Sequence, residues 1–293
     1  MENWTDNMKN FLIITNVYKD AGFRLTKKIG DYIRQRGGNC TCHQSIGEEA
    51  KNAAPPAEEI PEDTECVLVL GGDGTLIRAA AGMVKSGLPI IGVNLGTLGY
   101  LCELEESNVF AAIDELMQDH YMIEERMMLS GHKDMETKSV TEKVALNDIV
   151  IHRTGSLSVV SLNVSVNGEY LNTFRADGII LSTPTGSTGY NMSAGGPIVD
   201  PKAEMILITP INAHNLNSRS IVIGAEDEVV VEIGKRRSQK DETVEVSFDG
   251  DTAEKLAVGD RFVISRAKDT AKICKLSKKS FLEILSKKMQ TYT

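Results

Sequence analysis

The sequence predicts two domains, an α/β domain with a Rossmann-like parallel sheet and a β-rich, sandwich-like domain. Residues 11–17 and 66–70 are apolar, strand-like runs, and a segment with helical spacing follows each of them. After about residue 124 the helical spacing disappears, and short, turn-bounded strand patterns replace it. Alternating strands and helices are typical of a parallel sheet, whereas short strands in series are typical of a sandwich. We expect an α/β domain over 1–125 and an all-β domain over 126–278, with a helix at 279–293 packing back on the first.

The elements expected in the first domain follow from its spacing and its turn residues. Gly37 and Gly38 end the first helix, and Ser107 is a good N-cap for the last one. The acidic, proline-containing stretch 48–63 reads as a surface loop. The expected order is strand 11–17, helix 21–35, loop 48–63, strand 66–70, helix 75–85, strand 89–93, turns 94–100 and a helix from 107 to about 119.

The second domain is expected to consist of strands. Residues 160–166 alternate between apolar and polar side chains, and Asn167-Gly168 is a two-residue hairpin signal. Further strands are expected at 179–182, 205–209, 220–223, 228–233, 243–248 and 261–265, and the segment 281–289 has helical spacing.

Composition narrows the class of protein. The chain has 293 residues, 41% hydrophobic and 25% charged, with a net charge of −9. These values exclude a disordered or fibrous protein, and the acidic balance argues against nucleic acid or an anionic membrane as a partner. No stretch reaches the roughly 18 apolar residues of a membrane helix. We therefore expect a cytoplasmic protein.

The five cysteines are scattered, which favours a reducing compartment. Cys40-Thr41-Cys42-His43 resembles half of a metal site. Because no second Cys/His pair follows at zinc-like spacing, we expect no metal to be held by the protein there.

The glycine turn at residues 71–75 is the most informative motif. It follows the apolar run 66–70, and glycines at such a turn let backbone N–H groups approach an anion closely. Asp73 stands inside this turn, although its charge repels the phosphates that the turn attracts. Asp73 is therefore interpreted as a proton acceptor or a magnesium contact, and the structural alternative is that it caps the following helix.

A second segment, residues 175–197, is rich in hydroxyls and glycines and contains one aromatic residue, Tyr190. Directional donors and acceptors, close backbone approach and a stacking ring together fit a nucleotide base and its sugar. The structural alternative is a Ser/Thr-rich linker, but such linkers do not begin with an apolar strand like residues 179–182.

In five segments taken in order, the sequence resembles the NAD kinase family. The segments are 71–75, 92–100, 146–148, 175–197 and 208–219, and the resemblance spans about residues 66–250. It implies an α/β domain with a β-rich domain, and magnesium-dependent (or other divalent cation) transfer of a phosphoryl group from ATP, or from inorganic polyphosphate in some members. The acceptor is the 2′-hydroxyl of the adenosine ribose of NAD, and the product is NADP.

The resemblance assigns roles around the glycine turn. Asp73 is the proton acceptor for the ribose hydroxyl, and Gly74 contributes its backbone. An Asp suffices because phosphoryl transfer depends on positioning and charge neutralisation more than on a strong base. Arg78, one helical turn further, either holds a phosphate or is an ordinary solvated arginine.

The resemblance also assigns the dinucleotide site. Asn147 and Asp148 hold the adenine and ribose, the family often having Glu at the second position. Asp177, Gly189 and Ser193 receive the nicotinamide carboxamide, where many members have Ala in place of Gly189. The residues expected to line the dinucleotide are Thr188, Tyr190 and Asn191.

Four positions have weaker assignments. Arg175 either pairs with a phosphate or orients Asp177. Asn212 and His214 follow a family turn; Asn212 is taken as a binding residue, and His214 more as a structural histidine. The run Asp249-Gly250-Asp251 matches a family position near the ligand, but we interpret it as a hairpin turn.

The rival functions are a lipid kinase of the diacylglycerol kinase type, whose relatives share the glycine turn, and an NAD(P) sensor without catalysis. The acidic surface argues against the first and the intact Asp73 against the second. The resemblance also implies a homodimer or homotetramer.

Overall fold

The computed structural model describes residues 8–45, 54–96, 99–134, 142–154, 159–214, 218–235 and 244–291. The chain forms two compact units, which we call the N-terminal unit (Met1–Glu125 with Ala271–Thr293) and the C-terminal unit (Arg126–Thr270). Residues 271–278, which we expected in the second domain, fall in the N-terminal unit because they include a strand of its sheet.

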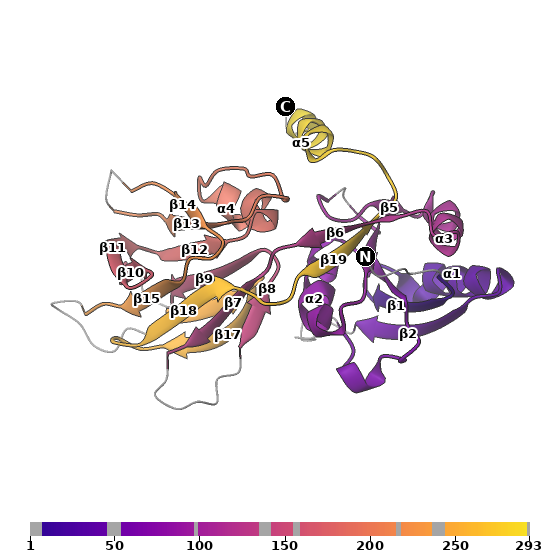
Figure 1. Ribbon diagram of the computed structural model, residues 1–293, viewed down its shortest axis with the longest axis horizontal. Helices are drawn as coiled ribbons and strands as arrows, with labels where there is room; N and C mark the ends of the chain where they lie inside the picture. The colour runs from indigo at the N-terminus through magenta and orange to yellow at the C-terminus, as the bar shows by residue number, and fades with distance from the viewer. Residues whose placement is uncertain are drawn as a thin grey trace. The chain divides into compact units, whose positions relative to one another are not determined.

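The N-terminal unit is built on a sheet with seven strands among the described residues (Figure 1). In spatial order the strands are β2 (Asn39–Ser45), β1 (Asn10–Asn16), β3 (Cys66–Gly71), β4 (Ile90–Asn94), β19 (Ala271–Lys275) and β6 (Met122–Arg126), with β5 (Leu104–Glu105) beside β4. The recorded pairs, which join β2 to β1, β1 to β3, β3 to β4, and β4 to both β19 and β5, are parallel. Strand β3 is buried along its whole length, as expected for a parallel strand covered on both faces.

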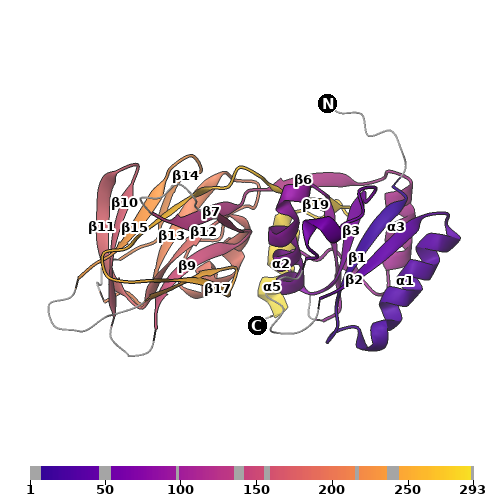
Figure 2. The same ribbon diagram turned by 90° about the horizontal axis from the view of Figure 1, so that it is seen from below.

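Helices cover both faces of this sheet. Helices α1 (Arg24–Gln35) and α3 (Val109–Met117) share a buried cluster with β1 and β3, and α2 (Asp73–Met83) lies on the opposite face (Figure 2). The other helical segments of this unit are η1 (Ala21–Phe23), η2 (Ala57–Glu59), η3 (Val84–Ser86) and α5 (Phe281–Thr291).

Two expected helix starts differ from the structure. Helix α2 begins at Asp73, two residues before the expected start, with Gly72 as its N-cap. The N-cap of α3 is Asn108 and not Ser107, and the Asn108 side chain accepts a hydrogen bond from the Glu105 N–H at 2.8 Å. This hydrogen bond ties the cap residue to the preceding turn. Residues 48–53 of the expected acidic loop lie outside the described residues.

The C-terminal unit consists of two sheets of six strands each within the described residues. The recorded pairs in both sheets are antiparallel, and a common core includes Phe174, Leu181 and Phe262. One sheet has the order β11 (Glu169–Ala176), β10 (Val160–Val166), β15 (Val229–Ile233), β18 (Arg261–Arg266), β7 (Leu129–Lys133), β8 (Lys143–Ala145). The other has β14 (Ile221–Gly224), β13 (Met205–Ile211), β12 (Gly178–Ser182), β9 (Asp148–Arg153), β16 (Val244–Phe248), β17 (Asp251–Leu256).

The hairpin turn that the sequence predicts at Asn167 and Gly168 is present in this unit. Asn167 and Gly168 join β10 to β11 with φ of 51° and 81°, the two positive values that a type I′ hairpin turn requires. The predicted fold class, an α/β domain with a β-rich sandwich, is confirmed. Among the described residues, no helix is long and apolar enough to cross a membrane.

Candidate functional site

The glycine turn lies at the carboxyl end of β3, where α2 begins. Gly72 is in an extended conformation, and its carbonyl accepts the Thr75 N–H at 2.9 Å. Asn16, the last residue of β1, donates to the Thr75 hydroxyl at 3.2 Å. The first N–H groups of α2, at Asp73 and Gly74, have no acceptor inside the helix. They form a positively polarised end that suits an anion.

The Asp73 carboxylate is bound by a neighbouring loop. The backbone N–H groups of Tyr100, Leu101 and Cys102 donate to it at 2.6, 3.3 and 3.1 Å. A Cβ on Gly99 would collide with this carboxylate, so Gly99 is needed for the loop to approach. To accept a proton from a ligand, Asp73 has to exchange some of these hydrogen bonds for one to the ligand.

The C-terminal helix contacts the same loop. Lys288 of α5 places its ammonium 4.1 Å from the ring centroid of Tyr100, within cation–π range. Residues 97 and 98, part of the expected turn, lie outside the described residues.

Lys19 is a basic residue at the glycine turn, and it is not among the site residues predicted from the sequence. A Cβ on Gly72 would come within 2.7 Å of the Lys19 ammonium, and one on Gly96 within 3.4 Å. The ammonium therefore occupies space that these two glycines leave free. Its signal in the sequence is its position just after the first strand, because the carboxyl ends of parallel strands meet at one edge.

A cavity of about 410 Å³ adjoins this lysine. It is lined by Lys19, Asn94, Leu95, Gly96, Glu105 and Glu106. Arg78, on the second turn of α2, is partly exposed and forms no hydrogen bond or ion pair among the described residues. The N-terminal unit thus offers helix-end amides, an ammonium and a carboxylate at one turn.

The C-terminal unit contains a separate pocket of about 440 Å³. Asn147, Asp148 and Tyr190, all expected from the sequence, line it together. Tyr190 is 47% exposed, so its ring is free to stack on a ligand. The remaining lining residues are Val150, His152, Ser247, Asp249 and Gly250.

Asn147, which lines this pocket, has a side-chain acceptor without a partner among the described residues. Its Oδ1 atom is buried and accepts no hydrogen bond from the described residues. Its backbone is fixed, because its N–H donates to Asp249 at 2.7 Å and its carbonyl accepts the Thr183 N–H at 2.8 Å. A buried acceptor without a partner is costly, and a ligand amino group removes that cost.

Two carboxyl groups share the pocket wall. Burial raises the pKa of Asp148 from its ordinary value of 3.8 to about 7, and the Asp249 charge adds to the shift. Burial also raises the pKa of Asp249 to about 6, although the N–H groups of Leu146, Asn147 and Asp148 lower it. Their charges are therefore coupled near neutral pH.

These raised pKa values predict a pH-dependent stability. A carboxyl whose folded pKa is raised stabilises the fold below its unfolded pKa, and this contribution is lost as pH rises through the folded pKa. For Asp148 the window runs from about 3.8 to about 7. Asp148→Asn, which has no charge to bury, should unfold roughly 3 °C higher than the wild type at pH 8 and at a similar temperature at pH 4.

Thermal unfolding by circular dichroism at both pH values measures this difference. Asp269→Asn is the matched control, because Asp269 is exposed, and it should unfold like the wild type at both pH values. An Asp148→Asn variant that is no more stable at pH 8 would contradict the burial argument.

Asp177 is held by residues other than Arg175. The Arg153 Nε donates to Asp177 Oδ1 at 2.7 Å, and Asn212 Nδ2 donates to Asp177 Oδ2 at 3.0 Å. Both hydrogen bonds lower the pKa of Asp177, and the one from Asn212 has the larger effect. No hydrogen bond or ion pair between Arg175 and Asp177 is recorded among the described residues. Arg175 is exposed, and its carbonyl accepts the His214 N–H at 2.9 Å.

The expected binding loop folds as η4 (Thr185–Thr188) and α4 (Tyr190–Ser193). Thr188 and Gly189 are partly exposed and Ser193 is exposed, so all three are accessible. An added Cβ on Gly189 would lie 3.5 Å from Asn147 Nδ2, which places this loop beside the pocket.

Asn191 differs from the expectation that it lines the dinucleotide. Its side chain is fully buried, and its amide donates to the Ser187 and Pro197 carbonyls at 3.2 and 3.0 Å. Its Oδ1 accepts the Thr209 hydroxyl at 2.7 Å. The Asn191 amide thus forms hydrogen bonds to the loop and to β13. It stabilises the shape of the loop and does not face its surface.

Of the remaining residues with weaker assignments, some line the pocket and others do not. Asp249 and Gly250, with φ of 50° and 87°, form the hairpin turn between β16 and β17. The Asp249 carboxylate nevertheless lines the pocket, while Asp251 is not among its lining residues. His214 is exposed. The turn sequence alone carries no signal for the additional position of Asp249 at the pocket, since Asp is common in such turns.

The described residues contain no group of three His, Cys, Asp or Glu side chains arranged to hold a metal ion. Cys40 and Cys42 are free thiols on β2.

Comparison with known proteins identifies the family. Residues 11–121 match the ATP-NAD kinase N-terminal domain and residues 146–276 the ATP-NAD kinase C-terminal domain. An NAD kinase of Agathobacter rectalis is 61% identical, over 98% of this chain and 100% of its own length.

Two solved structures share the fold. Yeast NADH kinase complexed with NADH aligns with a TM-score of 0.85 and 23% identity, covering 98% of this chain and 89% of its own. An NAD kinase from Archaeoglobus fulgidus in complex with ATP aligns with a TM-score of 0.72 and 22% identity, covering 94% and 99%. With both family domains matched in order and a near full-length relative at 61% identity, this chain belongs to the NAD kinase family.

Proposed function

We propose that this protein phosphorylates NAD, transferring the γ-phosphoryl group of ATP to the 2′-hydroxyl of the adenosine ribose to give NADP. The observation that carries the dinucleotide part is the buried, unpartnered amide oxygen of Asn147 beside Asp148 and the exposed ring of Tyr190. The kinase part is supported by the helix-end amides, Lys19 and Asp73 at the glycine turn. NAD and ATP together are a substrate pair that uses both the residues assigned to the dinucleotide and the groups at the glycine turn.

In this proposal Asp73 accepts the proton that the ribose hydroxyl releases as its oxygen attacks the γ-phosphorus. The P–O bond to the β-phosphate breaks, and ADP leaves with the electron pair. Asp73 can act late in this step, because phosphoryl transfer depends mainly on positioning and charge stabilisation. The Gly74 N–H and, on the next turn, Arg78 supply positive charge to the phosphates.

The adenine and ribose of NAD are assigned to the pocket of the C-terminal unit. Asn147 Oδ1 accepts the adenine amino group, Asp148 accepts from a ribose hydroxyl, and Tyr190 stacks on the base. The carboxamide of nicotinamide is assigned to Asp177, Gly189 and Ser193, with Thr188 beside them. Each Asp177 oxygen keeps a second lone pair after its hydrogen bond to Arg153 or Asn212. Arg175, exposed nearby in sequence, is assigned to a phosphate.

We further propose magnesium as the partner of ATP. Mg²⁺ is commonly bound by phosphates, waters and only one or two carboxylates, so it needs no three-residue protein cluster. The carboxylates of Glu105 and Glu106, which line the cavity beside Lys19, fit this sparse requirement. The ion neutralises charge on the transferring phosphates. A homodimer or homotetramer, and a cytoplasmic location, complete the proposal.

Lys19→Gln tests the phosphate assignment. Loss of a charge-assisted contact should raise the KM for ATP about tenfold and leave the KM for NAD nearly unchanged. Initial rates of NADP formation at varied ATP and varied NAD measure both constants. Lys28→Gln, a similar exposed lysine on α1, should behave like the wild type. Equal KM values for ATP in the two variants would contradict the role of Lys19.

A further inference from the structure

Two cysteines lie on one face of the edge strand β2. Cys40 and Cys42 are two residues apart, and side chains at this spacing point to the same side of a strand. Their Cα atoms are therefore about 6.6 Å apart, near the upper limit of the span that a disulfide bridges. Cys40 is half-buried, and its thiol donates to the Gly30 carbonyl of α1 at 3.7 Å. Cys42 is exposed.

Arg34 directs a positive charge at Cys40. Its Nη1 donates to the Cys40 sulfur at 3.2 Å, and its Nη2 holds Asp31 at 2.8 Å. A Cβ on Gly30 would lie 3.1 Å from this sulfur and 3.2 Å from Arg34 Nη2, so the missing side chain gives both groups room. A guanidinium beside a sulfur favours the reactive thiolate.

The two thiols differ in acidity. A hydrogen bond from Cys42, aided by Arg34 and opposed by burial, lowers the pKa of Cys40 to about 7. The same hydrogen bond, with burial, raises the pKa of Cys42. Cys40, which also receives the hydrogen bond from Arg34, is thus the more acidic and more nucleophilic thiol of the pair.

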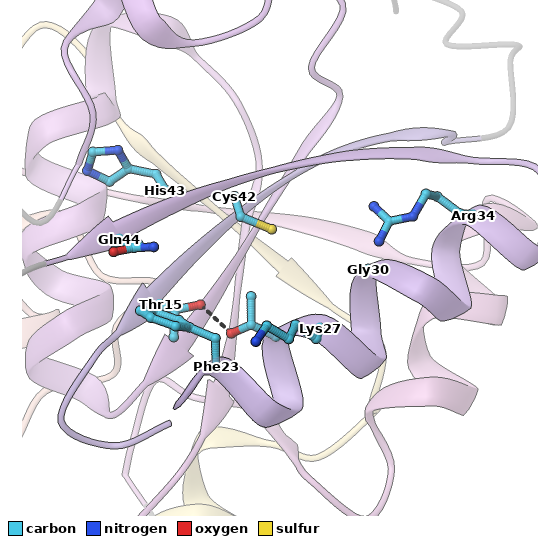
Figure 3. A pocket seen from close by; sticks show the side chains of 9 residues that line it. Thr15, Phe23, Lys27, Gly30, Arg34, Cys42, His43 and Gln44 are labelled. Atoms are coloured by element: carbon cyan, nitrogen blue, oxygen red, sulfur yellow. Dashed lines mark hydrogen bonds between the residues drawn. The ribbon is translucent and has the colours of Figure 1, made fainter. Parts of the chain in front are cut away.

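A cavity of about 200 Å³ lies beside this pair, and Cys42 and Arg34 are among the residues that line it. In Figure 3 the sulfur of Cys42 points to the side of the strand on which α1 presents Lys27 and Arg34. The cavity accommodates a small oxidant, and its charged side chains are cationic, which suits a polar or anionic reagent.

The other three cysteines are protected. Cys66 and Cys274 are fully buried, and Cys102 is 7% exposed. Hydrogen bonding to Cys274 and burial raise the pKa of Cys66, and burial raises that of Cys102. Buried, protonated thiols react slowly.

We propose that Cys40 and Cys42 form a peroxide-reactive dithiol, in which Cys40 is oxidised and Cys42 resolves it. The Cys40 thiolate attacks one oxygen of a hydroperoxide, the O–O bond breaks, and the other oxygen leaves as hydroxide or alkoxide and takes up a proton. Cys40 becomes a sulfenic acid, a two-electron oxidation matched by the two-electron reduction of the peroxide. The Cys42 sulfur then attacks the Cys40 sulfur, the S–O bond breaks, and hydroxide leaves as water with the Cys42 proton.

Mass spectrometry of the intact protein after brief treatment with hydrogen peroxide tests this assignment. The wild type should lose two hydrogen atoms, and mapping without reductant should find both cysteines in one disulfide-containing peptide. Cys42→Ser should instead accumulate a sulfenic acid at Cys40 that dimedone traps, and Cys40→Ser should form neither product.

A matched arginine pair tests the activation. Arg34→Gln should slow the reaction with peroxide on the order of fivefold, because less thiolate is present. Arg36→Gln, on the same helix end but paired with Tyr32 and Asp114, should react like the wild type. Oxidation of a buried cysteine first, a wild type that forms no disulfide, or equal rates in the two arginine variants would overturn the proposal. These products are read by mass, so the result is independent of whether the protein makes NADP.

Discussion

Asp73→Asn should lower the turnover number for NADP formation at least ~100-fold, in line with the contribution of a general base. The amide cannot accept the ribose proton, and this loss acts on the chemical step. Binding of NAD should change less than about threefold, because we assign the dinucleotide to residues of the C-terminal unit. Steady-state rates and calorimetric titration with NAD measure the two quantities separately.

The structure requires a control for the loop that Asp73 binds. Asn accepts hydrogen bonds through one oxygen only, so Asp73→Asn also weakens contacts to Tyr100, Leu101 and Cys102. Lys288→Ala removes the cation over Tyr100 and loosens the same loop without touching the carboxylate. We expect its turnover to stay within about threefold of the wild type. If both variants lose activity equally, the loop and not the base accounts for the effect.

Tyr190→Ala should raise the KM for NAD about tenfold, since stacking on a base is worth roughly 1–3 kcal/mol. The half-exposed ring lines the pocket that contains Asn147 and Asp148, and truncation removes its stacking surface. Rates at varied NAD measure the change. Because Tyr190 is assigned to the base of NAD and not to ATP, the KM for ATP should stay nearly constant.

Two matched variants separate stacking from other effects. Tyr190→Phe keeps the ring and should remain within about twofold of the wild type. Tyr170→Ala truncates another exposed tyrosine, on β11, that does not line the pocket, and it should leave the KM for NAD unchanged. An unaltered KM in Tyr190→Ala would exclude the stacking role.

Much of the fold could be predicted because its signals are local. The apolar run at β3 and the Asn167-Gly168 turn depend on neighbouring residues, and the structure has them where the sequence indicates. The glycine turn was likewise identified from the strand before it. The return of β19 to the first sheet was missed, since a pairing with β4 across most of the chain leaves no local pattern.

The site could be predicted only in part, for the same reason. Asn147, Asp148 and Tyr190 line one pocket as expected, but Arg153 reaches Asp177 through the pairing of β9 with β12, which a single sequence does not reveal. Asparagine is common in surface loops, so the sequence gives no sign that Asn191 is buried. It is buried because the loop folds around its amide.

One assay tests whether this chain phosphorylates NAD. The purified protein is incubated with ATP, magnesium and either NAD or diacylglycerol, and the products are separated by chromatography. We expect NADP formation that depends on ATP, with no phosphorylated lipid. Phosphorylated lipid without NADP would indicate a lipid kinase, and bound NAD without turnover would indicate a sensor. Either result would exclude the proposed phosphorylation of NAD.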